Sequence, residues 1–242
     1  MTNQSRNNGA GISPEFYATL GLELDTQQGL AYSLVKDIVE KYGVGEKALD
    51  YGCGAGRSTR LLRQIGFEQV VGVDVNQEML DMATEKEIPG ISYERIESGV
   101  LPFKDNTFNL AFSGLVILEI SSAPEVHKVL GELHRVVAPG GAVIILTCTR
   151  EGHLNGSDSF EPVLTVEQQA NLKSGDAVPT RVKETGQVFT DYYWSEEFLR
   201  TALQEAGLKV LEVRLSKAVT PQSNEPLAPK PKSPYVIYIA QK

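Results

Sequence analysis

A glycine loop between two apolar strands is the feature that most constrains this chain. An apolar strand over residues 48–50 leads into the loop Tyr51-Gly-Cys-Gly-Ala-Gly56, and a second strand over residues 70–73 ends on Asp74, 18 residues past Gly56. Alternating glycines let the backbone turn tightly and approach a ligand closely. A helix from Arg57 would then present free amide groups to that ligand. The segment therefore predicts a nucleoside-binding site, with Asp74 placed to accept hydrogen bonds from two ribose hydroxyls.

The spacing of the glycines separates two classes of cofactor. Dinucleotide sites favour G-x-G-x-x-G, whose third glycine lets the helix pack closely beside a pyrophosphate. Here the pattern is G-x-G-x-G, and Asp50 stands two residues before the first glycine. A carboxylate at that position would repel a pyrophosphate but would tolerate an ammonium and a sulfonium. The pattern favours a cationic amino-acid cofactor.

Four segments in order over residues 46–147 resemble the class I S-adenosylmethionine-dependent methyltransferases, in their small-molecule, UbiE/type-11-like branch. They are Leu49-Asp-Tyr-Gly-Cys-Gly-Ala-Gly56, Val71-Gly-Val-Asp74, the Glu97-Ser-Gly-Val-Leu-Pro-Phe103 stretch with the residues up to Phe108, and Leu133-His-Arg-Val-Val-Ala-Pro-Gly-Gly141. The resemblance implies S-adenosylmethionine as cofactor and methyl transfer to an O, N or C atom of a small metabolite. It does not cover the N-terminal arm or residues 150–190.

The resemblance also implies roles for particular residues. Asp50 would serve the amino-acid end of the cofactor, Asp74 the ribose, and the Ser113 carbonyl the amino group. The other implied cofactor-binding residues are Gly52, Gly54, Gly56, Val75, Met79, Glu97, Ser98 and Tyr17. Structural alternatives remain: Asp50 could cap the next turn, Asp74 could cap a helix, Glu97 and Ser98 could lie in a solvated loop, and Met79 and Tyr17 could be core residues.

Strands and helices alternate regularly after the glycine loop. This order predicts an α/β fold, a Rossmann-like, mostly parallel sheet with helices on both faces. The resemblance implies that the sheet has seven strands and that the last one is reversed. Residues 1–45 are expected to form an N-terminal arm and lid helix, and residues 46–242 the methyltransferase domain. Within it, residues 148–191 break the pattern with glycines and prolines around a short helix, Thr165 to Leu172. A segment of this length beside the site is interpreted as a substrate cap.

The composition of the chain limits the kinds of partner that it is expected to bind. The net charge of −8 argues against nucleic acid, because a phosphate backbone needs a basic face. A small molecule is therefore the expected target. No apolar run is long enough for a membrane helix or a signal peptide, which predicts a cytoplasmic protein. A monomer or a homodimer is expected. The two cysteines, Cys53 and Cys148, have no metal-ligand spacing, and no metal site is expected.

A general base is harder to assign. His153 follows the fifth strand in the expected cap, where a neutral imidazole suits proton removal near pH 7, and it is the candidate catalytic residue. His127 and His134 share one helix face and are expected to pack or lie on the surface. Glu119 is another candidate base. Tyr192, Tyr193 and Trp194 could stack on a substrate or form a packing cluster.

Two other functions remain open from the sequence. One is a protein that binds S-adenosylmethionine without transferring its methyl group, as a regulator or with the sulfonium in an electrostatic role. The other is a nicotinamide-dependent dehydrogenase, which the glycine spacing and Asp50 disfavour.

Overall fold

One large sheet organises the molecule. The computed structural model describes residues 27–42, 45–216 and 233–242, and seven of its strands form a sheet in the order β3-β2-β1-β4-β5-β10-β9. The strands are β1 (Lys47–Tyr51), β2 (Gln69–Asp74), β3 (Ile91–Arg95), β4 (Phe108–Gly114), β5 (Val137–Cys148), β9 (Lys209–Leu215) and β10 (Tyr235–Gln241). β10 is antiparallel to both of its neighbours, whereas β1 to β5 pair in parallel. The predicted seven-stranded sheet with a reversed last strand is confirmed.

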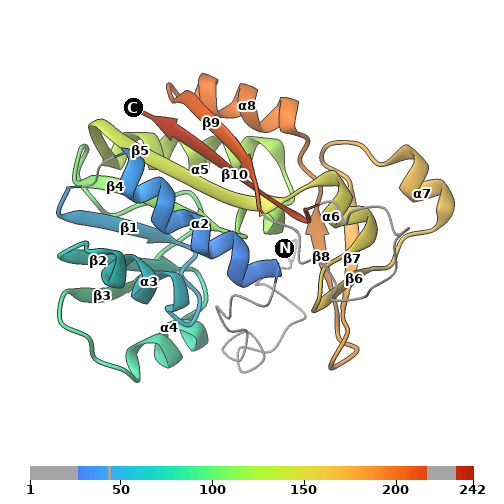
Figure 1. Ribbon diagram of the computed structural model, residues 1–242, viewed down its shortest axis with the longest axis horizontal. Coiled ribbons are helices and arrows are strands. Elements are labelled where there is room, and N and C mark those ends of the chain that lie inside the picture. Colours follow the sequence, from blue (N-terminus) through green and yellow to red (C-terminus); the bar gives the residue numbers. More distant parts are fainter. Residues whose placement is uncertain (1–26, 43–44, 217–232) are drawn as a thin grey trace, which may run out of the picture.

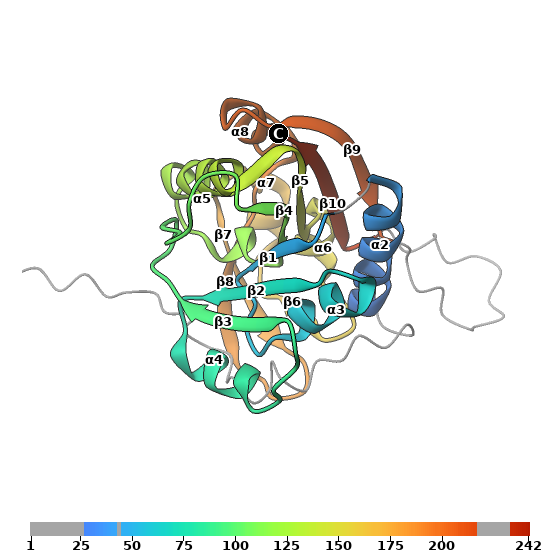
Figure 2. The same cartoon turned by 90° about the vertical axis from the view of Figure 1, so that its left-hand side faces the viewer.

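Helices cover both faces of this sheet (Figure 1). One face carries α2 (Gln27–Tyr42) and α3 (Arg57–Ile65), and the other carries α5 (Ala123–Val136) and α8 (Glu196–Glu205), as the end-on view shows (Figure 2). α4 (Gln77–Thr84) packs on β2 and β3. Because successive strand residues point to opposite faces, Ala48 of β1 belongs to the core under α2 and α3, and Leu49 to the core under α5.

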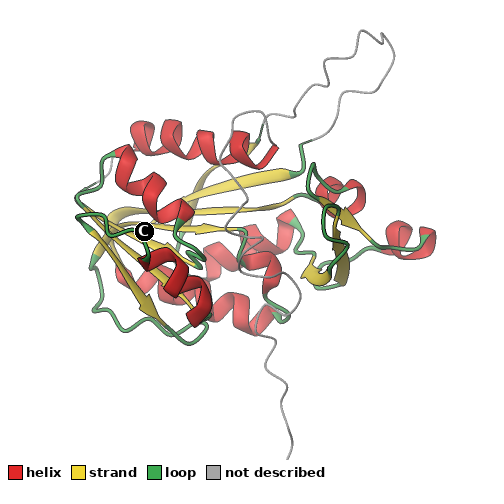
Figure 3. Cartoon of the chain, turned by 90° about the horizontal axis from the view of Figure 1, so that it is seen from below, coloured by secondary structure: helices red, strands yellow, loops and turns green. Residues whose placement is uncertain are grey.

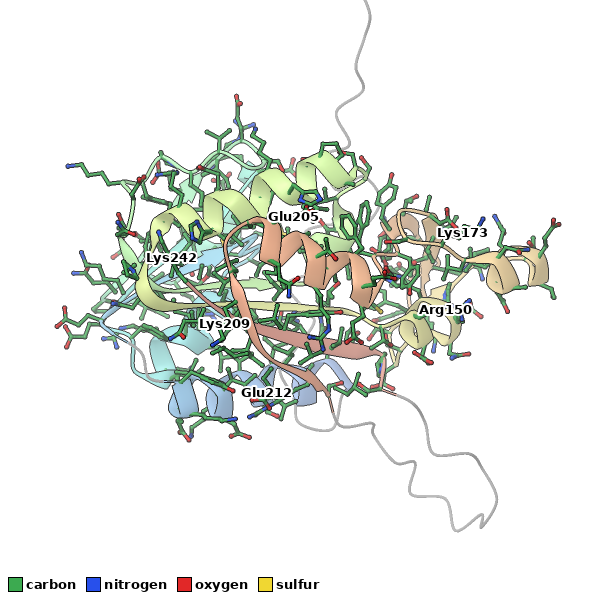
Figure 4. All side chains as sticks on the ribbon, turned by 90° about the horizontal axis from the view of Figure 1, so that it is seen from above. Arg150, Lys173, Glu205, Lys209, Glu212 and Lys242 are labelled. Carbon is green, nitrogen blue, oxygen red and sulfur yellow. The ribbon has the colours of Figure 1, made fainter. Side chains whose placement is uncertain are left out.

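The helices bury apolar stripes of the expected period. α5 buries Val126, Val129, Leu130, Leu133 and Val136, spaced three and four residues apart. α2 is tied to the sheet at its end, where Lys41 Nζ and the Tyr42 hydroxyl donate to Glu212 Oε2 of β9 over 2.8 and 2.5 Å. Figure 4 shows Glu212 on β9 beside α2.

The segment after β5 forms a small unit of its own at one end of the molecule (Figures 1 and 3). It contains α6 (Arg150–Asn155), β6 (Phe160–Pro162), α7 (Val166–Asn171), β7 (Ala177–Val182) and β8 (Val188–Tyr192), and its strands form an antiparallel sheet in the order β6-β7-β8. We call residues 149–194 the cap. From the sequence, one short helix and no strands were expected here. Of the glycines that suggested irregular structure, Gly156, Gly175 and Gly186 lie between elements with positive φ, whereas Gly152 lies in α6.

The cap lies beyond the carboxyl ends of the parallel strands. β8 packs against the 3₁₀ helix η1 (Ile117–Glu119), which follows β4, and α6 follows β5 directly. Among the helices that the structure describes, none is long and apolar enough to cross a membrane.

Candidate active site

The glycine loop is held against the second strand by its backbone. The amides of Gly52 and Cys53 both donate to the Val73 carbonyl, over 2.8 and 3.0 Å. Gly52, Gly54 and Gly56 have φ values of 73°, 51° and 79°, which favour glycine. A Cβ on Gly52 would lie 2.1 Å from Val116 Cγ2, whereas one on Gly54 would meet nothing within 4 Å. The loop is therefore packed at its start and open at Gly54, where a ligand has room.

Substituting Gly52 should damage the fold. In Gly52→Ala we expect the free energy of unfolding to fall by about 2–4 kcal/mol, because a left-handed backbone and a clash with Val116 add together. Urea denaturation followed by circular dichroism measures this. Gly186→Ala is the matched control, because Gly186 has the same φ of 73° and open space around it. Equal losses in the two variants would contradict the close packing of Gly52.

Asp74 links the second strand to the glycine loop. Its Oδ2 accepts from the Gly54 amide over 2.8 Å, and its Oδ1 accepts from the Asn76 amide over 2.9 Å. The cap of α4 is Asn76, whose side chain accepts from the amides of Glu78 and Met79. Burial raises the pKa of Asp74 above its usual value, against the lowering effect of these amides. Asn76, and not Asp74, therefore caps the helix, and the Asp74 carboxylate faces the loop.

Asp50 is a fully buried acid with one oxygen unused. Its Oδ2 accepts from Ser58 Oγ over 2.7 Å and Thr59 Oγ1 over 2.6 Å, both in the first turn of α3. Its Oδ1 has no partner among the described residues. Burial raises its pKa to about 6, although the two hydroxyls oppose the shift. One oxygen thus holds two side chains of the first turn of α3 without capping its backbone amides, and the other stays available to a cationic group.

The residues expected near an adenine follow the next two strands. Val75 and Met79 come directly after β2; the Val75 side chain is 42% exposed and Met79 is buried. Glu97, which is exposed, and Ser98, which is half-buried, follow β3. That loop is held to β1, because the Gly99 amide donates to the Tyr51 hydroxyl over 3.0 Å. The parallel pairing of β2 with β3 thus brings these residues to one edge with Asp74.

Ser113 lies in β4, opposite Tyr51 of β1, and is fully buried. Its Oγ has no partner within the described part of the chain. Two residues on, Leu115 has a φ of 61°, which is uncommon for a residue with a branched side chain. Such conformations cluster at ligand sites, and no sequence pattern identified this one. Tyr17, the remaining cofactor candidate, lies outside the described residues.

A pocket opens between this strand edge and the cap. It encloses about 560 Å³ of empty space, a volume that includes a part open to solvent. Its lining comes from α2, the ends of β4, β5 and β10, and the cap: Gln28, Leu115, Leu118, Cys148, Gly152, His153, Gly156, Ser157, Phe160, Pro162, Thr180, Phe189, Asp191 and Tyr235. The cap therefore supplies one wall of the pocket, and its role as a substrate cover stays a prediction.

His153 lies in the wall of this pocket. Its side chain is 3% exposed, and its ring packs edge-on against Tyr193 with 5.5 Å between centroids. Burial alone lowers its pKa to about 4, so the imidazole is neutral at pH 7. Among the residues expected to carry chemistry, His153 is the one that the structure places in the pocket.

The other candidate residues take part in packing or ion-pair contacts. Trp194 Nε1 donates to the Ile120 carbonyl over 3.1 Å and its ring stacks on Phe198, so Trp194 belongs to a packing cluster. His127 Nδ1 lies 3.4 Å from Glu205 Oε2, on the α5 and α8 side of the sheet where Figure 4 labels Glu205. Within the described ranges, no cluster of three or more metal-ligating side chains is found.

Comparisons with known proteins identify the family. A family model described as a methyltransferase domain matches residues 49–145. The demethylmenaquinone methyltransferase of Lactobacillus johnsonii is 35% identical over 205 residues, which cover 78% of this chain and 77% of that protein. This chain belongs to the S-adenosylmethionine-dependent methyltransferases. The 2-phytyl-1,4-naphtoquinone methyltransferase of Nostoc punctiforme is 35% identical over 137 residues, 54% of this chain and 55% of that protein.

Solved structures show the same methyltransferase fold. An S-adenosylmethionine-dependent methyltransferase from Mesorhizobium loti superposes with a TM-score of 0.66 at 19% identity, covering 89% of this chain and all of that one. A protein from Pyrococcus horikoshii gives a TM-score of 0.68 at 19% identity, over 94% of this chain and 98% of that one. The predicted methyl transfer from S-adenosylmethionine to a small molecule is confirmed, so the dehydrogenase and non-catalytic alternatives are set aside.

The residues present fit the cofactor of this methyltransferase. The unpartnered Asp50 Oδ1 can face a positive charge, Asp74 is an acid at the end of β2, and Gly54 leaves room for a close approach. Asp50, Gly54 and Asp74 all belong to one strand-loop-helix-strand unit, which fixes the distances between them.

Proposed function

We propose that this enzyme methylates an oxygen or carbon of an uncharged aromatic metabolite, such as a hydroquinone, in the pocket below the cap. The observation that carries the proposal is the pocket itself, which adjoins the carboxyl edge of the sheet. Its wall is mostly apolar and aromatic, with Phe160, Phe189 and Tyr235, and a few polar groups among them. The relatives named for demethylmenaquinone and 2-phytyl-1,4-naphtoquinone support this class of acceptor.

The cofactor would be held on the other side of the same edge. We assign its amino-acid end to Asp50 and the loop glycines Gly52, Gly54 and Gly56, and its ribose to Asp74. Val75, Met79, Glu97 and Ser98 would surround the base, and Ser113 would offer its carbonyl. When bound, S-adenosylmethionine supplies an electrophilic methyl group on a positively charged sulfur.

The chain contributes mainly position and exclusion of water. A pocket that holds the acceptor at near-attack distance lowers the barrier to methyl transfer by several kcal/mol. A hydroxyl acceptor must also lose a proton, and His153 is the proposed proton acceptor because its neutral imidazole faces the pocket. The apolar neighbours that lower its pKa also keep water away from it.

This assignment has a consequence for pH dependence. A base with a pKa of about 4 is deprotonated in about 99% of molecules at pH 6, so kcat/KM should not fall between pH 8 and 6 on account of His153. In His153→Gln we expect kcat to fall about 100-fold with little change in KM, as measured by steady-state kinetics. His127 lies on α5 beside Glu205 and does not line the pocket, so His127→Gln should leave kcat and KM unchanged. An acidic limb near pH 6.5 that disappears in His153→Gln would show instead a solvated histidine.

Methyl transfer itself is the test of the proposal. The enzyme is incubated with S-adenosylmethionine that carries a deuterated methyl group and with matched acceptors: 1,4-naphthohydroquinone, 2-naphthoate and 2-naphthylmethylamine. We expect S-adenosylhomocysteine and a deuterated product from the hydroquinone alone, located on oxygen or carbon by mass spectrometry. Transfer only to the carboxylate or the amine would overturn the proposed acceptor class.

We also propose that the enzyme works in the cytoplasm, as a monomer or homodimer, and without nucleic acid. The net charge of −8 supports the last point. Sedimentation of the purified chain would measure its oligomeric state.

A further inference from the structure

The cap contributes a buried acid, Asp191, to the wall of the pocket. Asp191 of β8 is 8% exposed and lines the pocket. Its Oδ2 lies 3.2 Å from Thr180 Oγ1, and its Oδ1 has no partner among the described residues. The Thr180 hydroxyl also lies 3.1 Å from the Val178 carbonyl and has one proton to donate, so it satisfies one of these oxygens at a time.

Among the described residues, the lining around Asp191 offers no lysine or arginine to pair with it. The titratable groups around it are Glu119 on η1, Cys148 on β5, His153 on α6 and Tyr235 on β10, and no lysine or arginine is among the described residues that line the pocket. An ionised, desolvated carboxylate without a cation or enough donors is costly. Burial, together with the nearby Glu119, accordingly raises the pKa of Asp191 well above its usual value. The protonated form of the side chain, which can donate a hydrogen bond, is therefore favoured over the ionised form.

Aromatic rings stand next to this donor. Phe189 is two residues before Asp191 on β8, so both side chains point to the same face of the cap sheet. The rings of Phe189 and Phe160 pack edge-on with 5.7 Å between centroids, and both line the pocket. A donor beside aromatic side chains suits a flat molecule that carries one oxygen acceptor.

We propose that Asp191 in its neutral form donates a hydrogen bond to an oxygen of the methyl acceptor, orients that acceptor, and restricts the pocket to uncharged ligands. This inference rests on the proposed function and deepens it by naming the residue that selects the acceptor. Carboxylates and phosphates are disfavoured, because they would bring a charge into a buried site whose described lining holds no lysine or arginine. Asp191 is here a binding and specificity residue, while proton removal remains with His153.

A set of naphthalene probes separates the hydrogen bond from apolar contact. The ketone 2-acetylnaphthalene only accepts hydrogen bonds and does not titrate, 2-ethylnaphthalene has nearly the same shape without the oxygen, and 2-naphthoate carries a charge. Their affinities for the full-length enzyme are measured by fluorescence titration in the presence of S-adenosylhomocysteine. We expect the wild type at pH 6 to bind the ketone about tenfold more tightly than the hydrocarbon, and the carboxylate more weakly than both.

Two variants assign the effect to Asp191. Asp191→Leu should bind the ketone and the hydrocarbon equally. Asp191→Asn keeps a donor that cannot ionise, so its preference for the ketone should persist at all pH values. In the wild type the preference should disappear as the pH rises through the raised pKa of Asp191, because the proton that makes the hydrogen bond is then lost. Circular dichroism and binding of S-adenosylhomocysteine show that each variant is folded.

The role of Asp191 and the proposed methyl transfer can fail independently of each other. An unchanged preference for the ketone in Asp191→Leu, or tight binding of 2-naphthoate by the wild type, would overturn the role of Asp191 even if methyl transfer to the hydroquinone is observed. Absence of methyl transfer to any aromatic acceptor would instead overturn the proposed function, whatever the probes show.

Discussion

Asp74→Ala should lose at least 100-fold in affinity for S-adenosylhomocysteine. The substitution removes the acid proposed to accept two ribose hydroxyls, and hydrogen bonds to charged groups contribute about 1.5–3 kcal/mol each. It also releases the Gly54 amide, which donates to Asp74 Oδ2 over 2.8 Å and fixes the glycine loop. Titration calorimetry of wild type and variant measures the loss.

A neighbouring acid provides the control for Asp74. Asp81 lies on α4, where its exposed side chain accepts a hydrogen bond from Gln77, and Asp81→Ala should bind as the wild type does. Gly54→Ala should also weaken binding while leaving the fold intact, because its Cβ would enter the open space above the loop. Unchanged affinity in Asp74→Ala would contradict the ribose assignment.

Asp50→Asn should have opposite effects on stability and on cofactor binding. The folded-state pKa of Asp50 is raised to about 6, about two units above its usual value, which corresponds to about 3 kcal/mol at most. Because the folded pKa is the higher one, the stability contributed by this group is present below about pH 4 and is lost as the pH rises through about 6. Asparagine does not ionise, so Asp50→Asn avoids this loss of stability.

The measurement for Asp50 is urea denaturation at two pH values. At pH 8 the cofactor-free variant should be more stable than the wild type by about 1–3 kcal/mol, and at pH 4.5 the difference should be much smaller. Its affinity for S-adenosylmethionine should fall about tenfold, because the amide no longer offsets a positive charge. A variant that is less stable at pH 8 and binds normally would mean that Asp50 serves only to hold Ser58 and Thr59 in α3.

The parts of the fold that were predictable from the sequence are those with local signals. The glycine loop, Asp74 and the alternation of strands and helices follow from short patterns, and strand pairing in parallel then brings residues such as Glu97 and Ser113 to one edge. The reversed β10 followed from the family resemblance.

The cap was less predictable because its stability comes from tertiary contacts. Its strands are short and interrupted by Gly175 and Gly186, whose turns resemble irregular structure in the sequence. Asp191 had no signal of its own, since a single acid is usually solvated, and its burial comes from tertiary packing such as that of β8 against η1. The unused oxygen of Asp50 also depends on side-chain geometry that the sequence does not specify.

The most direct test of the whole account is a crystal structure of the enzyme with S-adenosylhomocysteine and 1,4-naphthohydroquinone. We expect the ribose at Asp74, the amino-acid end near Asp50, and the sulfur facing the pocket that His153 and Asp191 line, with the hydroquinone against the ring pair Phe160 and Phe189. Cofactor density away from the glycine loop, or an acceptor bound outside the cap pocket, would contradict it.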